Sequence, residues 1–536
     1  MKHCSILVLV LLLALALRLY PTLVSGMPFS TDGWGPIRNA EIIVAHSPID
    51  LRNETLFDGY HNYWPAVSVF GAFLSLITGL RPIAAMSIGV PIIAALTVLI
   101  FYALVKRFGG NRGLALLSAL VLTVVYPFAL FTAGVTKETY ATPLYLTAIL
   151  LFLGYGKIRE TFLFIVASIA LVFAHHLAAL TTAAVIFSVA LGGALNNFRM
   201  GESVKKSSFI PAAALASAVA LYLKFYAYNG LFAKAALTSS DFISAFSYQA
   251  VLFGAALYFT YGKPKQQSFK SAFKCIAISI LVLLSVVLCT RRAIIPGAPI
   301  LPTRYLGYAT PFVVSAPLTV LGAGEILRGK KLCYLTLAFW ISVLLGVEGY
   351  AIFGSPPVGF SLAYRVVNLI TVPAAVLCAA GLYSLALGFH GSLGGLRRIV
   401  ASALLLVIVA SNVYDLYASV SLGERYMGYF WKYTQAEFSA GEWLSENACW
   451  TVAGDVKVYY LLGEYFGLEV DTVQALKYFY GEASKHPSLF MVHGSMVENG
   501  YVFYGGYSVD LPSGWTERIA GLSQIYSNGF VKVYMG

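Results

Sequence analysis

The sequence has little charge and few cysteines. Only 11% of its 536 residues are Asp, Glu, Lys or Arg, and 59% are hydrophobic; soluble domains carry about 25% charged residues. So little polar surface excludes a single water-soluble globule, and the high apolar content excludes intrinsic disorder. Six cysteines in so long a chain are too few for a disulfide framework. The composition therefore predicts a helical protein that crosses the membrane many times.

The charge is divided unevenly along the chain. Residues 419–536 hold 7 Lys and Arg against 12 Asp and Glu, a balance of −5, whereas residues 1–418 hold the other 29 and 12, a balance of +17. We therefore predict two domains, a multi-span membrane domain over 1–418 and an extracytoplasmic domain over 419–536. The excess of Lys and Arg does not indicate nucleic acid as a partner, because cytoplasmic loops of membrane proteins collect these residues.

Apolar runs close to the ~20 residues that a spanning helix needs predict an all-α membrane domain. Thirteen such runs lie at 4–25, 82–105, 114–132, 141–156, 161–176, 178–195, 208–227, 247–262, 272–289, 305–325, 332–353, 365–388 and 399–418. One further run, 64–80, is ambiguous by length. The first run is either a cleaved signal peptide or an anchor; its length and Arg18 favour an uncleaved anchor.

Basic clusters in every second loop predict the orientation. They lie at 106–112, 157–159, 199–206, 263–274, 328–331 and 397–398, and with Lys2 they hold 18 of the 29 basic residues of the membrane domain. The positive-inside rule assigns this side to the cytoplasm. All of these basic loops lie on the same side only if 64–80 does not cross the membrane, so we expect an interfacial or re-entrant helix there. The N-terminus is then cytoplasmic and 419–536 lies outside the plasma membrane.

The predicted outer side carries the unusual residues. The first outer loop, residues 26–81, holds five acids: Asp32, Glu41, Asp50, Glu54 and Asp58. The second holds Lys137 and Glu138, and the outer ends of later runs hold His175, His176, Arg291, Arg292, Arg304, Glu348 and Arg365. Taken singly, each is explained by solvent, a lipid headgroup or a neighbouring helix. Because ionisable groups at span ends are costly unless they serve a polar cavity, together they predict an outward-facing polar site.

The residue types indicate the chemistry of that site. A carboxylate can act as a general base toward a hydroxyl or amide, or can ligate a hard cation such as Mg²⁺ or Mn²⁺. Arginines bind phosphate through two hydrogen bonds. In a membrane, this combination predicts the transfer of a group from a phosphorylated lipid to an acceptor, with arginines stabilising the charge on the leaving phosphate.

Several segments, taken in order, resemble a known superfamily. They are "TDGWGPIRNAEII" after the first run, "YWPAVSVFGAFLSLITGLRP", "LVKRFGGNRG", "GVTKETYATPLYL", "FAHHLAAL" and the late "AYRVVNLITVPAAVL". This order resembles the C-type (GT-C) membrane glycosyltransferases, which include the oligosaccharyltransferase catalytic subunit, protein O-mannosyltransferases and aminoarabinose transferase. The likeness is greatest to uncharacterised archaeal members. It covers the first ~200 residues best.

The resemblance implies an inverting glycosyltransferase that uses a polyprenyl-phosphate-linked sugar and a protein, lipid or glycan acceptor at the outer face. Asp32 matches the catalytic acid, Glu138 the acid of the second outer loop, and Arg365 the late arginine that contacts the donor phosphate. Arg304, Arg291 and Arg292 are weaker phosphate candidates. Two departures are that Asp32 is followed by Gly33 rather than a second acid, and that 419–536 lacks a WWDYG-like motif.

The remaining expectations concern the lining of the site, a metal and the tail. Trp34 offers a flat face for a sugar ring, and Lys137, His175, His176 and Glu348 are expected to line the site. A divalent cation, Mg²⁺ or Mn²⁺, held by Asp32 and Glu138 is left open. In the tail we expect an α/β domain in which Asp455 caps a helix, with strands at 449–455, 468–473, 488–495 and 500–509, helices at 456–467 and 474–483, and a hairpin at 524–534 turning at Asn528-Gly529.

Two other functions stay open at this point. A transporter or lipid flippase would also need many spans, but it should place charge near the midplane and show broken helices in matching halves. An accessory membrane subunit without chemistry would not explain why carboxylates and arginines gather on one side. The concentration of acids in an extended outer loop therefore favours the glycosyltransferase.

Overall fold

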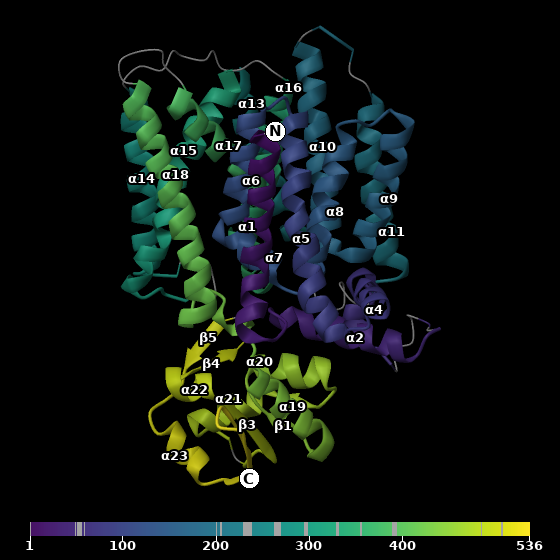
Figure 1. The fold of residues 1–536 in the computed structure, drawn as a ribbon, viewed down its shortest axis with the longest axis vertical. Helices are drawn as coiled ribbons and strands as arrows, with labels where there is room; N and C mark the ends of the chain where they lie inside the picture. The colour runs from purple at the N-terminus through teal and green to yellow at the C-terminus, as the bar shows by residue number, and fades with distance from the viewer. Residues whose placement is uncertain are drawn as a thin grey trace. The chain divides into compact units, whose positions relative to one another are not determined.

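The computed structural model describes the chain except for residues 1, 49, 51–55, 58, 200, 204–205, 229–237, 262–269, 294–298, 329–331, 354–355, 388–393, 484 and 505–506. The chain forms two compact units (Figure 1). Unit 1 comprises Met1–Arg18, Ile93–Thr132 and Tyr140–Tyr417, and unit 2 comprises Leu19–Ile92, Ala133–Thr139 and Ala418–Gly536. Unit 2 thus gathers the first outer loop, the start of the "TKETYA" segment and the tail.

Unit 1 is built from long helices that run roughly side by side (Figure 1). With the helices that continue into unit 2, they are α1 (Lys2–Ser25), α5 (Pro82–Arg107), α6 (Arg112–Val124), α7 (Tyr126–Ala133), α8 (Lys137–Phe152), α9 (Ile158–Ala174), α10 (His176–Arg199), α11 (Ile210–Phe225), α13 (Ser239–Tyr261), α14 (Lys270–Cys289), α15 (Thr310–Arg328), α16 (Leu332–Phe353), α17 (Pro356–Leu387) and α18 (Gly394–Tyr417). Short 3-10 turns η2 (Lys206–Phe209) and η3 (Thr303–Ala309) connect some of them.

The predicted runs coincide with these helices. Eight helices of the described chain are long and apolar enough to cross a membrane, or nine if α6 and α7 form one bent span. The protein is therefore a multi-pass membrane protein, while thirteen crossings and their orientation stay predictions. The ambiguous run 64–80 forms α4 (Ala66–Thr78), whose 13 residues are shorter than the ~20 that a span requires.

The bend between α6 and α7, 64°, follows from the sequence. Residue 127 is proline, which has no N–H for the carbonyl of Thr123 four residues earlier. Arg18 of α1, fully buried, donates to that carbonyl at 3.0 Å. Asn412 of α18 accepts the backbone N–H of Tyr126 at 2.8 Å. The two side chains replace helix hydrogen bonds that the break removes, as buried backbone in a membrane requires.

Unit 2 combines short helices of the outer loop with the tail. The outer loop forms η1 (Thr31–Gly33), α2 (Trp34–Ala45), α3 (Gly59–Asn62) and α4. The tail forms η4 (Ala418–Leu422), η5 (Tyr429–Trp431), α19 (Gln435–Asn447), β1 (Val452–Ala453), α20 (Val456–Tyr459), η6 (Tyr460–Tyr465), β2 (Val470–Asp471), α21 (Thr472–Tyr480), β3 (Leu489–His493), α22 (Gly494–Asn499), β4 (Tyr501–Tyr504), β5 (Tyr507–Asp510), α23 (Trp515–Ala520), β6 (Ser523–Ser527) and β7 (Val531–Met535).

The tail is an α/β domain, as predicted. Its sheet has the order β2-β1-β3-β7-β6, with β1 parallel to β2 and β3, and β7 antiparallel to β3 and β6. A separate hairpin pairs β4 with β5. The predicted turn at Asn528-Gly529 joins β6 to β7, with Gly529 at φ +90°. Asp455 caps α20 by accepting the N–H of Val458 at 3.0 Å, which confirms the expected cap.

Candidate active site

Asp32 lies in a strained turn of unit 2. Ser30, two residues before Asp32, has φ +91°, a conformation that costs a non-glycine residue about 1–3 kcal/mol. Two hydrogen bonds hold it, from Ser30 N–H to the carbonyl of Trp431 at 2.9 Å and from Gly33 N–H to that of Ser30 at 3.3 Å. Such strain persists only where the surroundings over-determine it, and it concentrates at functional sites. The backbone therefore marks the Asp32 turn independently of the resemblance.

The second outer loop packs directly on this turn. The N–H of Val135 donates to the carbonyl of Phe29 at 2.9 Å. A Cβ at Gly33 would lie 2.8 Å from the carbonyl oxygen of Val135, so only glycine allows this approach. The glycine that replaces the second acid of the mannosyltransferase pattern thus brings the Asp32 segment against the segment that leads into Glu138.

Glu138 stands in the first turn of α8. Thr136 caps this helix, because its Oγ1 accepts the N–H of Thr139 at 3.0 Å. A helix N-terminus favours a negative charge in its first turn, which is the position that Glu138 occupies. Its side chain is buried, at 8% exposure. Asp32 and Glu138 are therefore both held by defined local structure within one unit.

Lys137 belongs to a buried polar chain that the sequence did not predict. Its Nζ lies 3.2 Å from Nδ1 of His61, whose Nε2 lies 3.2 Å from Oε2 of Glu464 in η6. An ammonium can only donate, so Nδ1 accepts and Nε2 carries the hydrogen that faces Glu464. The Lys137 ammonium also lies 4.1 Å from the centroid of the Tyr60 ring, a cation–π contact.

A glycine makes room for this chain as well. A Cβ at Gly35 would lie 2.4 Å from Cδ2 of His61. The two glycines of "TDGWG" therefore make room for different neighbours: Gly33 for Val135 and Gly35 for His61. Both bring a distant segment against the Asp32 loop.

The ring of Trp34 lies inside unit 2, whereas the sequence led us to expect a flat face open to a sugar. The side chain is fully buried, at 0% exposure. Its ring centroid lies 5.0 Å from that of Tyr433, 5.3 Å from Tyr465 and 5.9 Å from Phe438, with which it stacks. Trp34 instead anchors the outer loop to the tail inside unit 2.

The other acids of the first loop differ in environment. The pKa of Glu41 is raised, because the effect of burial is larger than two opposing effects. The hydroxyl of Tyr465, which donates to Glu41 at 2.9 Å, and the positive charge of Arg81 both lower this pKa. Asp50 is exposed, which suits it as a control. Glu54 and Asp58 lie outside the described residues.

The predicted arginines all belong to unit 1. Arg291 and Arg292 are exposed after the end of α14, and Arg304 is exposed in η3. The N–H of Leu301 donates to the carbonyl of Cys289 at 3.1 Å, so the two arginine-bearing segments are joined at the base of one loop. Arg365 is half-buried in α17, and its Nε donates to the hydroxyl of Tyr364 at 3.4 Å.

The remaining predicted site-lining residues of unit 1 are His175, His176 and Glu348, and their contacts differ. His175 is buried between α9 and α10, and its Nδ1 accepts the N–H of Ala178 at 3.3 Å, so it caps α10. The ring of His176 lies 4.9 Å from that of His175. Glu348 is half-buried near the end of α16, and its Oε2 is buried with no hydrogen-bond partner in the described part of the chain.

Within the residues that the structure describes, no group of three or more His, Cys, Asp and Glu side chains is arranged to hold a metal ion. Asp32 and Glu138 supply two carboxylates, which are hard oxygen ligands. That donor set fits Mg²⁺, which is commonly held by one or two carboxylates, with waters and substrate phosphate completing its coordination.

The fold was compared with solved structures. The apo oligosaccharyltransferase from Archaeoglobus fulgidus matches with a TM-score of 0.60 at 14% identity, over 92% of this chain and 70% of that chain. The archaeal oligosaccharyltransferase AglB from Archaeoglobus fulgidus, in complex with an inhibitory peptide and a dolichol-phosphate, matches with a TM-score of 0.54, at the same identity and coverage. ArnT from Cupriavidus metallidurans in the apo state gives 0.49 at 10% identity, over 100% of this chain and 98% of that chain.

Neither the protein-family models nor the curated proteins give a match to the sequence. The structural matches nevertheless define the class of fold. The chain has the C-type glycosyltransferase fold, which the order of its sequence motifs also predicts.

Proposed function

We propose that the protein is an integral-membrane glycosyltransferase that moves a sugar from a polyprenyl-phosphate-linked donor to an acceptor at the outer face. One observation carries the proposal: the strained Asp32 turn and the start of α8, with Lys137 and Glu138, are packed together through Gly33 and Val135 in unit 2. The fold supports it, since the solved structure of an oligosaccharyltransferase with the same fold holds a dolichol-phosphate.

The proposed reaction is a single displacement. Asp32 takes the proton from an acceptor hydroxyl or amide, and the acceptor atom attacks the anomeric carbon as the bond from that carbon to the phosphate oxygen breaks. The electron pair of the broken bond leaves with the polyprenyl phosphate. Attack opposite the leaving group inverts the anomeric centre. Glu138, stabilised by the N-terminus of α8, assists Asp32.

Lys137 is proposed to supply positive charge near the two carboxylates. Its ammonium is oriented by His61, and His61 is oriented by Glu464. Glu464 and His61 are thus positioning residues, because they act through Lys137. This proposal also gives the tail a function, since one of its residues fixes the geometry of the outer loop.

The arginines of unit 1 are proposed to bind the donor phosphate, first Arg365 and then Arg304, Arg291 and Arg292. This role rests on the resemblance and on the bidentate geometry of guanidinium with phosphate. A divalent cation held by Asp32 and Glu138 is part of the proposal. When bound, it would supply positive charge to the donor phosphate, while Asp32 and Glu138 would position it.

The test uses the purified full chain with a panel of polyprenyl-phosphate-linked sugars, and mass spectrometry of the products. We expect one donor to be consumed with release of polyprenyl phosphate. Asp32→Asn should lower the rate ~10²–10⁴-fold, the usual cost of losing a general base, while Asp50→Asn retains the wild-type rate. Equal rates for both variants would remove Asp32 from the chemistry. Movement of labelled lipid between leaflets without any transfer would favour a flippase instead.

A further inference from the structure

A cavity of about 600 Å³ lies among α5, α8 and α9 in unit 1. Its lining includes Lys106 and Arg107 from the end of α5, Leu150 from α8, and Arg159 and Glu160 from the first turn of α9. The three cations belong to two of the basic loops, 106–112 and 157–159, that the sequence assigns to the cytoplasmic side. None of them is part of the proposed active site.

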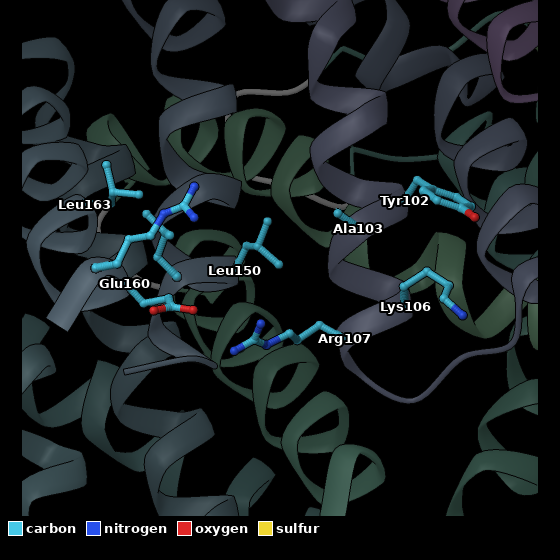
Figure 2. Close-up of a pocket in the computed structure, with 9 residues that line it drawn as sticks. Tyr102, Ala103, Lys106, Arg107, Leu150, Glu160 and Leu163 are labelled. Atoms are coloured by element: carbon cyan, nitrogen blue, oxygen red, sulfur yellow. The ribbon is translucent and has the colours of Figure 1, made fainter. Parts of the chain in front are cut away.

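The cations of this cavity are not neutralised by the protein. Within the described ranges, the side chains of Lys106, Arg107, Arg159 and Glu160 form no ion pair or hydrogen bond. Arg107 and Arg159 against Glu160 leave a net charge of about +1 at neutral pH on the side of α5 that faces α8 and α9. Figure 2 shows Arg107 reaching from α5 toward Glu160 with Leu150 between the helices, while Lys106 extends to the other side of α5.

The position of Arg107 depends on a glycine. A Cβ at Gly154, in the turn after α8, would lie 2.2 Å from Nη2 of Arg107 and 3.1 Å from Cγ of Glu160. The guanidinium therefore passes directly over Gly154. Adding one methyl group there would displace the guanidinium without changing any charge.

We propose that this cavity binds the headgroup of an anionic phospholipid that carries hydroxyl groups. Arg107 and Arg159 match a phosphate, because guanidinium groups bind phosphate oxygens in pairs, and basic pockets between membrane helices bind anionic headgroups. Glu160 repels a second phosphate but accepts hydrogen bonds from hydroxyls, as in a glycerol headgroup. Leu150, Leu151 and Leu163 in the lining fit the apolar part of a lipid, which a soluble phosphate ester lacks.

The experiment measures binding of phosphatidylglycerol to the full chain in neutral detergent, by native mass spectrometry and by the shift of the melting temperature. Phosphatidic acid, phosphatidylcholine and soluble glycerol phosphate are the comparison ligands. We expect phosphatidylglycerol to bind most tightly and phosphatidylcholine not to bind at the site. Stronger binding of glycerol phosphate than of phosphatidylglycerol would overturn a lipid site in favour of a soluble phosphate ester.

The variants separate a built site from general surface charge. Arg107→Gln/Arg159→Gln should weaken phosphatidylglycerol binding ~10–100-fold, and Gly154→Ala should weaken it with every charge retained. The matched control is Arg397→Gln/Arg398→Gln, which removes two arginines from another basic loop and should leave binding unchanged. Equal losses in the two double variants would overturn the proposal.

Glu160→Gln tests the hydroxyl preference. Without the negative charge, phosphatidic acid should bind at least as tightly as phosphatidylglycerol. If the preference for phosphatidylglycerol is unchanged in Glu160→Gln, the assignment of hydroxyl recognition to this residue is wrong.

Discussion

The two units bury polar groups in different ways. In unit 2, buried ionisable side chains are paired: Lys457 with Glu437, at 4% and 2% side-chain exposure, and His493 with Asp455, both at 1%. In unit 1, several buried hydroxyls bond back to their own helix, for example Thr132 to the carbonyl of Phe128 at 2.5 Å and Thr182 to that of Ala178 at 2.6 Å. Such bonds need no partner from another element.

The difference follows from the surroundings of each unit. Unit 1 exposes large apolar side chains on its helices, such as Leu9, Phe162 and Leu281, and in lipid these carry no penalty. Because lipid is as apolar as leucine, helix association there depends on close fit at small residues. The tail in unit 2, which the sequence predicts to lie in water, gains from apolar burial, but any charge that it buries has to be paired. Substitutions should therefore have different consequences in the two units.

The largest effect should come from breaking a buried pair of unit 2. Lys457→Met leaves the Glu437 carboxylate buried without its partner, which typically costs about 3–5 kcal/mol. The measurement is the opening free energy of the tail amides, by hydrogen exchange on the purified full chain. Lys457→Met/Glu437→Gln should recover most of the loss, since glutamine keeps the capping geometry at Thr434. A loss no larger than that of the exposed Glu469→Gln would contradict the comparison.

A cation of unit 1 should matter for transfer rather than for folding. Arg365→Ala removes a charge-assisted contact to donor phosphate, worth about 1.5–3 kcal/mol, or ~10–150-fold in rate. Arg365→Lys keeps the charge without the planar fork and should recover part of the activity. The comparison is Arg397→Ala in a predicted cytoplasmic loop, measured as sugar transfer at equal expression. Equal rates for the two alanine variants would count against a donor-binding role.

What the sequence predicts well is encoded locally. The thirteen apolar runs coincide with helices of the described chain, since a run of about twenty apolar residues has few alternatives in a membrane. The Asp455 cap and the Asn528-Gly529 hairpin were also predicted, because each depends on residues within a few positions of one another. The order of short motifs was enough to predict the fold class.

What the sequence did not predict depends on distant segments. Glu464 reaches His61 across 403 residues of sequence, and no local pattern links them. The aromatic run around Tyr60 and Trp64 could have drawn attention to His61, but not to its partner in the tail. Trp34 was placed in the site because of its neighbour Asp32, whereas the packing of three tail aromatics buries it. The strain at Ser30 likewise arises from a contact with Trp431.

Close helix contact in unit 1 gives a third prediction. A Cβ at Gly322 of α15 would lie 1.8 Å from the carbonyl oxygen of Leu377 in α17, and one at Gly381 would lie 2.0 Å from that of Leu318. Gly322→Ala should therefore separate the two helices and destabilise unit 1 by about 1–3 kcal/mol. Gly254→Ala is the matched control, because a Cβ there meets nothing within 4 Å. If the melting temperature in detergent falls equally for both variants, the close contact between α15 and α17 does not contribute to the stability of unit 1.

The smallest effect should appear only in acid. Burial raises the pKa of Asp455, but the charge and hydrogen bond of His493 and the N–H groups of Val458 and Phe503 outweigh it, so the net pKa in the folded state is lowered. A lowered folded pKa contributes stability that is complete above the unfolded value, ~3.9. This stability declines as the pH falls below that value, and it is gone below the folded pKa.

Asp455→Asn keeps a capping side chain and removes the titration. We expect the difference in tail stability between wild type and Asp455→Asn, measured by thermal unfolding from pH 5 down to pH 3, to start from a fixed value at about pH 5. The difference should then shift in favour of the variant below about pH 4. A difference that stays constant down to pH 3 would mean that the Asp455–His493 pair has the same proton affinity folded and unfolded.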